Sequence, residues 1–358
     1  MHGGASFAAI GADFADLDRR RAIVDADVLD AWYPPAPSVV QEVAAHLEWL
    51  MKTSPPTHSE GLRAAIAEHT GLPGACILPG GGTSPFIFSA LPRMVSSGDR
   101  VCILDPMYGE YRHVLENLVG AEVVSLPLAP ERDFRVDPQA LLEAANGCRL
   151  VIVVNPNSPT GQCLSRDEWE EIRRGLPETT RVWVDETYID FAPGRPSVEP
   201  WVADDPRFVV AKSLSKFFAL SGLRVGYLAA DTAFIWEVER FTPPWSVGTL
   251  AQVAAVRALE AYDYYQAKAS ETHALRQAMS DALDEMPGLR CVGSVTNFLM
   301  FEAPSASALV EGARKHGVYL RDCGSISQRF ADRYVRTAVK SAEENGRIIE
   351  AIRRSVAP

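Results

Sequence analysis

The chain has 358 residues, of which 47% are apolar and 23% are charged, and its formal net charge at pH 7 is −11. This composition is that of an ordinary globular protein, and the length predicts two domains. The acidic balance disfavours binding to nucleic acid or to an anionic membrane, because both require clustered lysine and arginine.

The six cysteines and seven histidines are scattered, with no spacing typical of a metal site. We therefore predict that no metal is bound and that the cysteines are reduced core residues. The first residues lack the basic start and unbroken apolar run of a signal peptide, since Asp13 interrupts them. No segment approaches the roughly 18 apolar residues of a membrane helix. A soluble, cytoplasmic protein is expected.

The predicted elements begin after an irregular segment that ends near Val40, where the prolines of "YPPAP" at 33–37 favour extended backbone. Two helices are expected at 38–51 and 59–69, and Ser59 with Glu60 supplies capping groups for the second. Strands and helices then alternate. The expected strands are 75–78, 100–104, 122–126, 149–154, 181–184 and 208–212, and the expected helices between them are 84–95, 108–119, 137–145 and 166–175.

Several of these strands are continuously apolar and β-branched, as they are when helices cover both faces of a sheet. The alternation predicts an α/β protein with a mainly parallel sheet. After about Trp245 the pattern changes to a long helix at 249–286, ended by Pro287 and Gly288. Short strands and helices follow, with a last helix from Ala342. This α+β tail predicts a second, smaller domain.

Four polar segments follow predicted strands, where ligand sites form in open α/β sheets. The first, "PGGGTSP" at 79–85, is a glycine-rich turn before a helix and suits a phosphate group, although its spacing matches no nucleotide-binding motif. The second, "VVNPNSPTG" at 153–161, is a polar turn broken by prolines. The first is equally compatible with a turn that binds nothing, and the second is also compatible with a plain tight turn.

The other two segments carry charged residues. Asp185 ends the strand in "VWVDETYIDF", and a carboxylate there needs a cation or a hydrogen-bond donor. In "AKSLSKFFALSGLRVGY" Lys216 precedes Arg224 by eight residues. A lysine in an apolar setting loses its charge readily and can act as a nucleophile, whereas most lysines are solvated surface groups.

One cofactor accounts for all four segments. Pyridoxal phosphate requires a lysine for its aldehyde, an anion for its ring nitrogen, a partner for its ring hydroxyl and a site for its phosphate. The motifs N-P-N-S-P-T-G, D-E-T-Y, S-L-S-K and G-L-R-V-G, in this order, resemble the fold-type I aminotransferases of class I and II. The most similar branch contains histidinol-phosphate aminotransferase and threonine-phosphate decarboxylase.

The resemblance runs from about Val28 to the C-terminus and implies the architecture of that fold. A large domain that binds pyridoxal phosphate, with a mainly parallel sheet flanked by helices, would cover 42–270. A small α+β domain would combine 1–41 with 271–358. The resemblance also implies a homodimer with the site at the subunit interface.

The resemblance further implies roles for single residues. Lys216 would form the Schiff base with the cofactor and carry the proton at the substrate α-carbon. Asp185 would keep the ring nitrogen protonated, and Tyr188 would donate a hydrogen bond to the ring hydroxyl. The cofactor phosphate would be surrounded by Gly82, Thr83, Ser84, Ser213, Ser215 and Arg224.

Further roles follow from the segments "DPMYGEY", "YVRTAV" and "YLRD". Tyr111 would stack on the cofactor ring, with Tyr108 close by. Arg336 would bind the substrate carboxylate, since a guanidinium offers a bidentate fork. Arg321 would face a substrate phosphate; the alternative is a surface ion pair with Asp322.

The chain departs from the family pattern in segments near the substrate. Ser158 precedes P-T-G where relatives have asparagine, so either Asn157 or Ser158 contacts the cofactor ring. T-S-P follows the glycines in place of S-D-E. Ser54 or Pro55 stands where relatives have a tyrosine that contacts the neighbouring subunit's cofactor phosphate.

The early N-x-N-P-x-G-P motif of the family is replaced by "LDAWYPPAP". This change brings Trp32 and Tyr33 either to the substrate entrance or into packing between the domains. Because the cofactor motifs are intact while the substrate-facing segments differ, the sequence disfavours histidinol phosphate as the substrate.

The leading hypothesis is a pyridoxal-phosphate-dependent aminotransferase that acts on an amino acid or an amino-phosphate-type substrate and passes the amino group to a 2-oxo acid. A second hypothesis keeps the cofactor but breaks another bond at the α-carbon, by decarboxylation, elimination or C–C bond chemistry in specialised metabolism. A third is a non-catalytic binding protein with the same fold, which the retention of Lys216, Asp185, Tyr188 and Arg224 disfavours.

Overall fold

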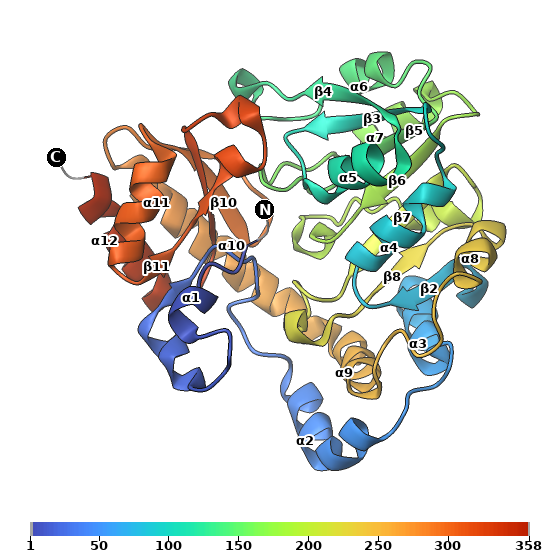
Figure 1. Ribbon diagram of the computed structural model, residues 1–358, viewed down its shortest axis with the longest axis horizontal. Helices are drawn as coiled ribbons and strands as arrows, with labels where there is room; N and C mark the ends of the chain where they lie inside the picture. The colour runs from blue at the N-terminus through green and yellow to red at the C-terminus, as the bar shows by residue number, and fades with distance from the viewer. Residues whose placement is uncertain (1–2, 357–358) are drawn as a thin grey trace.

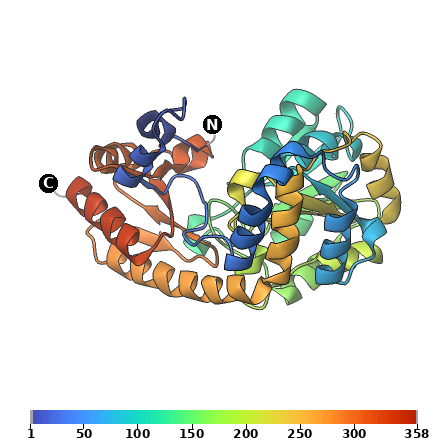
Figure 2. The same ribbon diagram turned by 90° about the horizontal axis from the view of Figure 1, so that it is seen from below.

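The computed structural model describes residues 3–356, which form two lobes side by side (Figure 1). The larger lobe holds a seven-stranded sheet, and the smaller lobe holds a four-stranded sheet together with the first residues of the chain. Helix α10 (Tyr262–Asp284) runs from one lobe into the other (Figure 2). The predicted division into 42–270 and the two terminal segments places its later boundary inside α10, and we keep this division as a proposal.

The sheet of the larger lobe has the strand order β2-β8-β7-β6-β5-β3-β4. Its strands β3 to β7 pair in parallel, while β8 runs antiparallel to both of its neighbours. The strands are β2 (Ile77–Gly80), β3 (Arg100–Asp105), β4 (Glu122–Pro127), β5 (Leu150–Val154), β6 (Arg181–Asp185), β7 (Phe208–Ser213) and β8 (Gly226–Ala229). The predicted α/β class with a mainly parallel sheet is confirmed, although the four-residue β8 was not predicted.

Helices cover both faces of this sheet (Figures 1 and 2). They are α3 (Glu60–Thr70), α4 (Ser84–Ser89), α5 (Glu110–His113), α6 (Pro138–Ala144), α7 (Arg166–Gly175), α8 (Thr232–Glu239) and α9 (Thr249–Glu260), and α2 (Pro37–Lys52) packs on α9. Because the sheet is covered on both sides, every residue of β5 and of β7 is buried. This explains why these strands are continuously apolar until their carboxyl ends.

Helix α7 matches its predicted bounds because its signals are local. Ser165 and Glu168 form a capping box, while Trp169 and Ile172 face the core. Other helices differ from prediction. At the start of α3, Ser59 has left-handed backbone and makes no side-chain capping bond.

Three predicted helices are also interrupted. The expected helix at 84–95 stops as α4 and continues as a short 3-10 turn at Leu91–Arg93. The expected helix at 108–119 becomes α5 followed by a π-helical turn at Val114–Val119. Ala261 leaves helical geometry and divides the expected helix at 249–286 into α9 and α10.

The smaller lobe has an antiparallel sheet of order β12-β13-β10-β9. Its strands are β9 (Arg290–Val292), β10 (Phe298–Glu302), β12 (Arg321–Asp322) and β13 (Tyr334–Ala338), and its helices include α11 (Ala306–Lys315) and α12 (Ala342–Val356). In the segment predicted to be irregular, α1 (Phe7–Ile10) and β1 (Val24–Asp25) form, and β1 pairs with β11 (Val318–Tyr319). The first part of the chain is therefore bonded to its last part.

The topology gathers the polar segments at one edge. Strands β5, β6 and β7 are adjacent and parallel, with Val154 opposite Asp185 and Asp185 opposite Ala211. The segments that leave these strands, beginning at Asn155, Glu186 and Leu214, therefore emerge together. Within residues 3–356, no helix is long and apolar enough to span a membrane.

Gly226 in β8 is expected to tolerate no side chain. A Cβ at this position would lie 2.4 Å from the carbonyl oxygen of Lys212 and 3.1 Å from the Cα of Gly82. We expect Gly226→Ala to lower the free energy of unfolding by about 1–3 kcal/mol because backbone must move. Thermal unfolding measures this effect, with Gly222→Ala as the control, since a Cβ at Gly222 meets no atom within 4 Å. Equal melting temperatures for the two variants would contradict the expectation.

Candidate active site

A cavity of about 300 Å³ lies at the carboxyl ends of β5, β6 and β7. Its lining includes most of the residues singled out from the sequence, which come from both lobes. These are Thr83, Ser84, Ser158, Asp185, Tyr188, Ser213, Ser215, Lys216, Arg224 and Arg336. The remaining wall includes Asp27, Val28 and Leu29 of the N-terminal segment.

One end of the cavity is built for an anion. Arg224 Nη1 donates a hydrogen bond to Ser215 Oγ at 3.2 Å, and the Ser215 amide donates to Ser213 Oγ at 3.2 Å. Gly82 has a φ of +94°, and a Cβ there would lie 2.9 Å from Arg224 Nη2. Glycine is therefore needed for the turn to approach the guanidinium. The hydroxyls and the cation together suit a phosphate group.

A buried carboxylate, that of Asp185, lines the same cavity. It accepts hydrogen bonds from the Thr187 amide at 3.0 Å, the Thr187 hydroxyl at 2.6 Å and the Tyr111 hydroxyl at 2.7 Å. Burial raises the pKa of Asp185, while the bonds from Thr187 and Tyr111 act in the opposite direction. A cationic group in the cavity would offset this cost of burial.

Lys216 reaches the cavity from the segment after β7, and its amine is paired. Its Nζ lies 2.9 Å from Oδ1 of Asp30. Sequence reasoning missed Asp30, which lies 186 residues from Lys216 along the chain. The only available signal was its place in the "LDAWYPPAP" segment, where the chain departs from the family pattern.

These groups fit pyridoxal phosphate. The cavity offers an amine at Lys216, a carboxylate at Asp185, a phenol at Tyr188 and an anion site near Arg224. Two features are explained by such a ligand: the buried Asp185 carboxylate, which has no cationic partner among residues 3–356, and the turn at Gly82 that only glycine allows.

The expectation that Tyr111 stacks on the cofactor ring is wrong. The side chain is fully buried, and its hydroxyl donates to Asp185 while accepting from Trp183 Nε1 at 2.9 Å. Tyr111 therefore lies behind Asp185 and supports it. Tyr108, which precedes α5, lines the cavity instead.

The turn after β5 presents Ser158 to the cavity and not Asn157. The Asn157 amide donates to the Pro106 carbonyl at 3.0 Å and to the Thr160 hydroxyl at 3.0 Å, which holds it away from the cavity. Ser158 Oγ accepts a hydrogen bond from Arg336 Nη1 at 3.2 Å. Of the two candidates for contact with the cofactor ring, Ser158 is the one that lines the cavity.

Trp32 and Tyr33 do not line the cavity. The Tyr33 hydroxyl donates to the Phe217 carbonyl at 2.7 Å, and Trp32 Nε1 donates to the Thr272 hydroxyl at 2.9 Å. Both rings pack between the N-terminal segment and the larger lobe or α10. Their predicted place at the substrate entrance is wrong, and the alternative of packing fits the structure.

A second cavity of about 530 Å³ adjoins the first and shares Tyr108, Ser158 and Arg336 with it. Arg321 lines this second cavity. Its guanidinium lies 3.6 Å from the buried carboxylate of Asp27, so the expected alternative, a surface pair with Asp322, is replaced by a buried pair. Arg336 donates to the Asp27 carbonyl at 3.0 Å, which places both arginines beside one segment.

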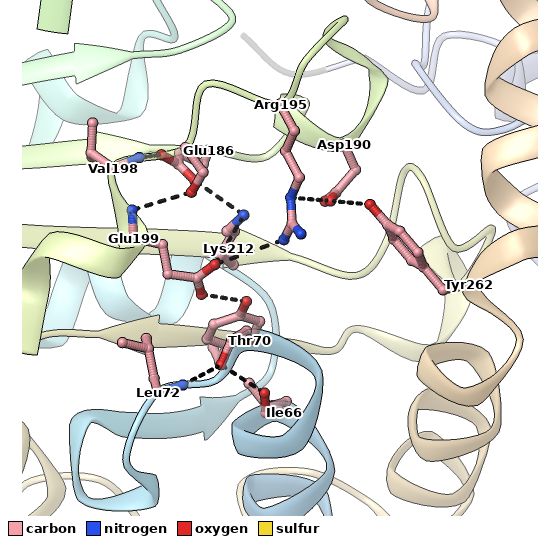
Figure 3. A network of polar contacts seen from close by, with 12 residues as sticks. Ile66, Thr70, Leu72, Glu186, Asp190, Arg195, Val198, Glu199, Lys212 and Tyr262 are labelled. Atoms are coloured by element: carbon pink, nitrogen blue, oxygen red, sulfur yellow. Dashed lines mark hydrogen bonds and ion pairs between the residues drawn. The ribbon is translucent and has the colours of Figure 1, made fainter. Parts of the chain in front are cut away.

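A network of charged side chains joins residues that are chain neighbours of the cavity lining (Figure 3). Lys212 Nζ is 3.0 Å from Glu186 and 3.5 Å from Glu199, while Arg195 pairs with Asp190 at 3.0 Å. Burial raises the pKa of Glu186 even though Lys212 opposes the shift. Lys212 precedes Ser213 and Glu186 follows Asp185, so the network holds the two strand ends that carry site residues.

Sequence reasoning missed this network because Lys212 was assigned only to a strand. Among residues 3–356, no group of three or more histidine, cysteine, aspartate or glutamate side chains has an arrangement that would hold a metal ion. The three acids of the network, Glu186, Asp190 and Glu199, are partners of Lys212 and Arg195.

Known proteins resemble this chain in both sequence and fold. The family model described as aminotransferase class I and II matches residues 28–352. The histidinol-phosphate aminotransferase of Symbiobacterium thermophilum is 30% identical over 325 residues, which are 90% of this chain and 87% of the relative.

Solved structures confirm the predicted fold. The histidinol-phosphate aminotransferase of Sinorhizobium meliloti, solved in complex with pyridoxal-5'-phosphate, has a TM-score of 0.86 at 22% identity and covers 99% of this chain and 95% of its own. The L-threonine-O-3-phosphate decarboxylase of Porphyromonas gingivalis has a TM-score of 0.79 at 21% identity, over 92% of this chain and 98% of its own.

The raised pKa of Asp185 predicts how stability depends on pH. The folded protein retains this proton above pH 4, where the unfolded chain releases it, so Asp185 makes the free energy of unfolding fall as pH rises. As the pH rises from 4 to 7, the free energy of unfolding of Asp185→Asn should therefore fall less than that of the wild type. The difference should be about 1.4 kcal/mol for each unit by which the pKa is raised. Urea unfolding of the ligand-free protein measures it.

Asp190→Asn is the matched control because its carboxyl group is also buried but shifts the other way. Burial acts to raise the pKa of Asp190, and Lys212 and Arg195 together lower it. Because the pKa of Asp190 lies below 4 in the folded and in the unfolded chain, Asp190→Asn should keep the wild-type pH dependence between pH 4 and pH 7 and differ from it only at lower pH. Identical pH dependence in the wild type and Asp185→Asn would contradict the assignment of a raised pKa.

Proposed function

The chain belongs to the class I and II aminotransferases, and we propose that it transfers the amino group of an amino acid or amino-phosphate-type substrate to a 2-oxo acid. It is a pyridoxal-phosphate-dependent transferase, which confirms the family, enzyme class and cofactor predicted from the sequence. The observation that carries the proposal is the cavity that brings Lys216, Asp185 and the anion-binding residues together.

We assign the cofactor-binding roles from the lining of this cavity. Pyridoxal phosphate, when bound, supplies an aldehyde for amines and a ring that accepts electrons from bonds at the substrate α-carbon. Lys216 would hold the aldehyde carbon and move the proton at the α-carbon. Asp185 would keep a proton on the ring nitrogen, and Tyr188 would donate to the ring hydroxyl oxygen. The phosphate would be held by Thr83, Ser84, Ser213, Ser215 and Arg224.

Arg336 is the proposed site for the substrate carboxylate. It lines both cavities, burial lowers the pKa of its guanidinium, and its Nε makes no hydrogen bond within the described chain. A carboxylate ligand would offset the burial of this cation through a bidentate contact. The position suits a substrate that lies between Lys216 and the second cavity.

Arg321 would then face the distal end of the substrate, inside the second cavity. The name of the Symbiobacterium thermophilum relative supports a phosphate at this end. Asp27 lies beside Arg321 and reduces the positive charge available there, which supports a distal group of lower charge. We therefore keep both an amino phosphate and an α-amino acid as substrate classes.

Lys216→Ala tests the proposed function. Wild-type protein with added pyridoxal phosphate should absorb at roughly 410–430 nm, and the variant should lack this band because it has no amine to engage the aldehyde. Transfer of the amino group should fall by about 10³-fold or more. Absorbance spectra and 2-oxo acid release from a panel of L-amino acids and from L-histidinol phosphate measure both effects. Lys315→Ala, at an exposed lysine of α11, is the control.

The same assay separates the alternatives. Carbon dioxide release without a 2-oxo acid would favour decarboxylation, because the bond that breaks depends on which bond stands perpendicular to the ring. An absorbance band without any turnover would favour the binding protein. Absence of the band in the wild type after addition of pyridoxal phosphate would contradict the proposal altogether.

We also propose that the chain forms a homodimer through an exposed apolar stripe on α2. Val40, Leu47 and Met51 are 50%, 44% and 74% exposed, and their spacing places them on one side of the helix. Helix α2 packs on α9, and its buried residues Val39 and Leu50 lie about a quarter turn from the stripe, which is left exposed. A second copy would cover it. The cytoplasmic location expected from the sequence stays a prediction.

Charges on the stripe should prevent dimer formation. We expect Leu47→Glu combined with Met51→Glu to sediment as a monomer, since a buried interface tolerates unpaired carboxylates poorly. Sedimentation velocity on the cofactor-loaded protein measures this. Trp236→Glu on α8, where the ring is 61% exposed, should leave the dimer intact. A monomeric wild type, or a dimeric double variant, would contradict this interface.

A further inference from the structure

Asp30 is a carboxylate at the proposed catalytic lysine that belongs to no family motif described above. Its Oδ1 lies 2.9 Å from Lys216 Nζ, and the side chains of Asp30 and Lys216 are 47% and 18% exposed. This distance is that of a charge-assisted hydrogen bond. The pair joins the N-terminal segment to the loop that follows β7.

The backbone around Asp30 is held by the smaller lobe. The Ala26 amide donates to the Tyr319 carbonyl at 2.9 Å, and the Ala338 amide donates to the Ala26 carbonyl at 2.9 Å. The Asn297 side-chain amide donates to the Leu29 carbonyl at 3.0 Å. The residues just before Asp30 are therefore hydrogen-bonded to three segments of the smaller lobe. These bonds fix the place of Asp30 beside Lys216.

The charges around the pair come from several elements. Ser221 and Lys340 also face the Asp30 carboxylate, and Tyr188 interacts with it electrostatically. Lys340 is buried, and Asp25 and Glu344 face its ammonium together with Asp30. Asp30 is thus a carboxylate between two lysines.

The charge state of Asp30 follows from these neighbours. Burial acts to raise the pKa of Asp30, but Lys216, Ser221 and Lys340 together lower it below the ordinary value. The group is therefore ionised at neutral pH and offers a full negative charge to the lysine nitrogen.

We propose that Asp30 is a positioning residue for Lys216: its carboxylate holds the lysine nitrogen at the cavity and places a negative charge beside it. The proposal rests on the proposed function, in which this nitrogen engages pyridoxal phosphate. Asp30 keeps its charge throughout and forms no covalent bond. The ion pair between Asp30 and Lys216 carries the inference.

Asp30→Asn tests the proposal through the absorbance of the cofactor-loaded protein as a function of pH. The visible band changes when the lysine nitrogen that holds the cofactor loses its proton. Because a carboxylate at this distance stabilises the protonated form, its removal should lower the pH midpoint of the change by about one unit or more. Asp30→Glu retains the charge and should restore the midpoint toward that of the wild type.

Two further variants separate a charge effect from a structural one. Asp25→Asn changes a carboxylate of the same segment that bonds to Ser6 and to the Val28 amide, and it should leave the midpoint unchanged. Lys340→Met removes a positive charge near Lys216 and should move the midpoint upward, opposite to Asp30→Asn. Circular dichroism and cofactor content establish that each variant is folded.

The outcomes distinguish this inference from the proposed function. A wild type that gains no visible band with pyridoxal phosphate would contradict both. A normal visible band in both proteins would overturn the role of Asp30 alone in two cases. In the first, the pH midpoint is the same in the wild type and in Asp30→Asn. In the second, the band of neither protein changes with pH. A lowered midpoint in Asp30→Asn, with recovery in Asp30→Glu, would support it.

Discussion

The position of the site depends on the buried ion network between β6 and β7. Glu186, Glu199 and Asp190 face Lys212 and Arg195, and Glu186, Glu199 and Lys212 are buried. A buried charge is tolerated only with its partners in place, and loss of one partner costs about 3–5 kcal/mol. The network therefore permits few alternative positions for the strand ends. Because Asp185 and Ser213 are the chain neighbours of Glu186 and Lys212, the constraint passes directly to the cavity.

Side chains of opposite charge line different parts of the cavity, and their arrangement defines what the cavity can bind. Arg224 and the serine hydroxyls lie at one part of the wall, Asp185 at another, and Arg336 near the entrance to the second cavity. A ligand must then present an anion, a cation and a second anion to different walls. Pyridoxal phosphate with a bound amino acid carries these three charges. The burial of Asp185 and Arg336 shifts both pKa values against the charged form, so a complementary ligand relieves two costs at once.

The parts of the fold and site that follow from local sequence were predictable, and the parts that depend on distant contacts were not. The strands β3 to β7 and helix α7 have strong apolar patterns or caps within their own residues. The pairing of Asp30 with Lys216 joins segments 186 residues apart, and the departure from the family pattern around Asp30 does not indicate its partner. The choice between Tyr108 and Tyr111 shows a different limit of sequence-based prediction. Both tyrosines lie in one short segment, and only the position at which α5 begins decides which ring faces the cavity.

The two lobes contribute different residues to the site. Lys216, Asp185 and Arg224 come from the larger lobe, whereas Asp27, Arg321 and Arg336 come from the N-terminal segment and the sheet of the smaller lobe. The proposed cofactor contacts Lys216, Asp185 and Arg224 therefore lie on family motifs of the larger lobe, whereas Asp27 lies in the N-terminal segment, which departs from the family pattern. A change in the N-terminal segment can alter the charge around Arg321 and Lys216 without touching the anion site near Arg224. This separation gives a physical reason why one cofactor site can serve different substrates.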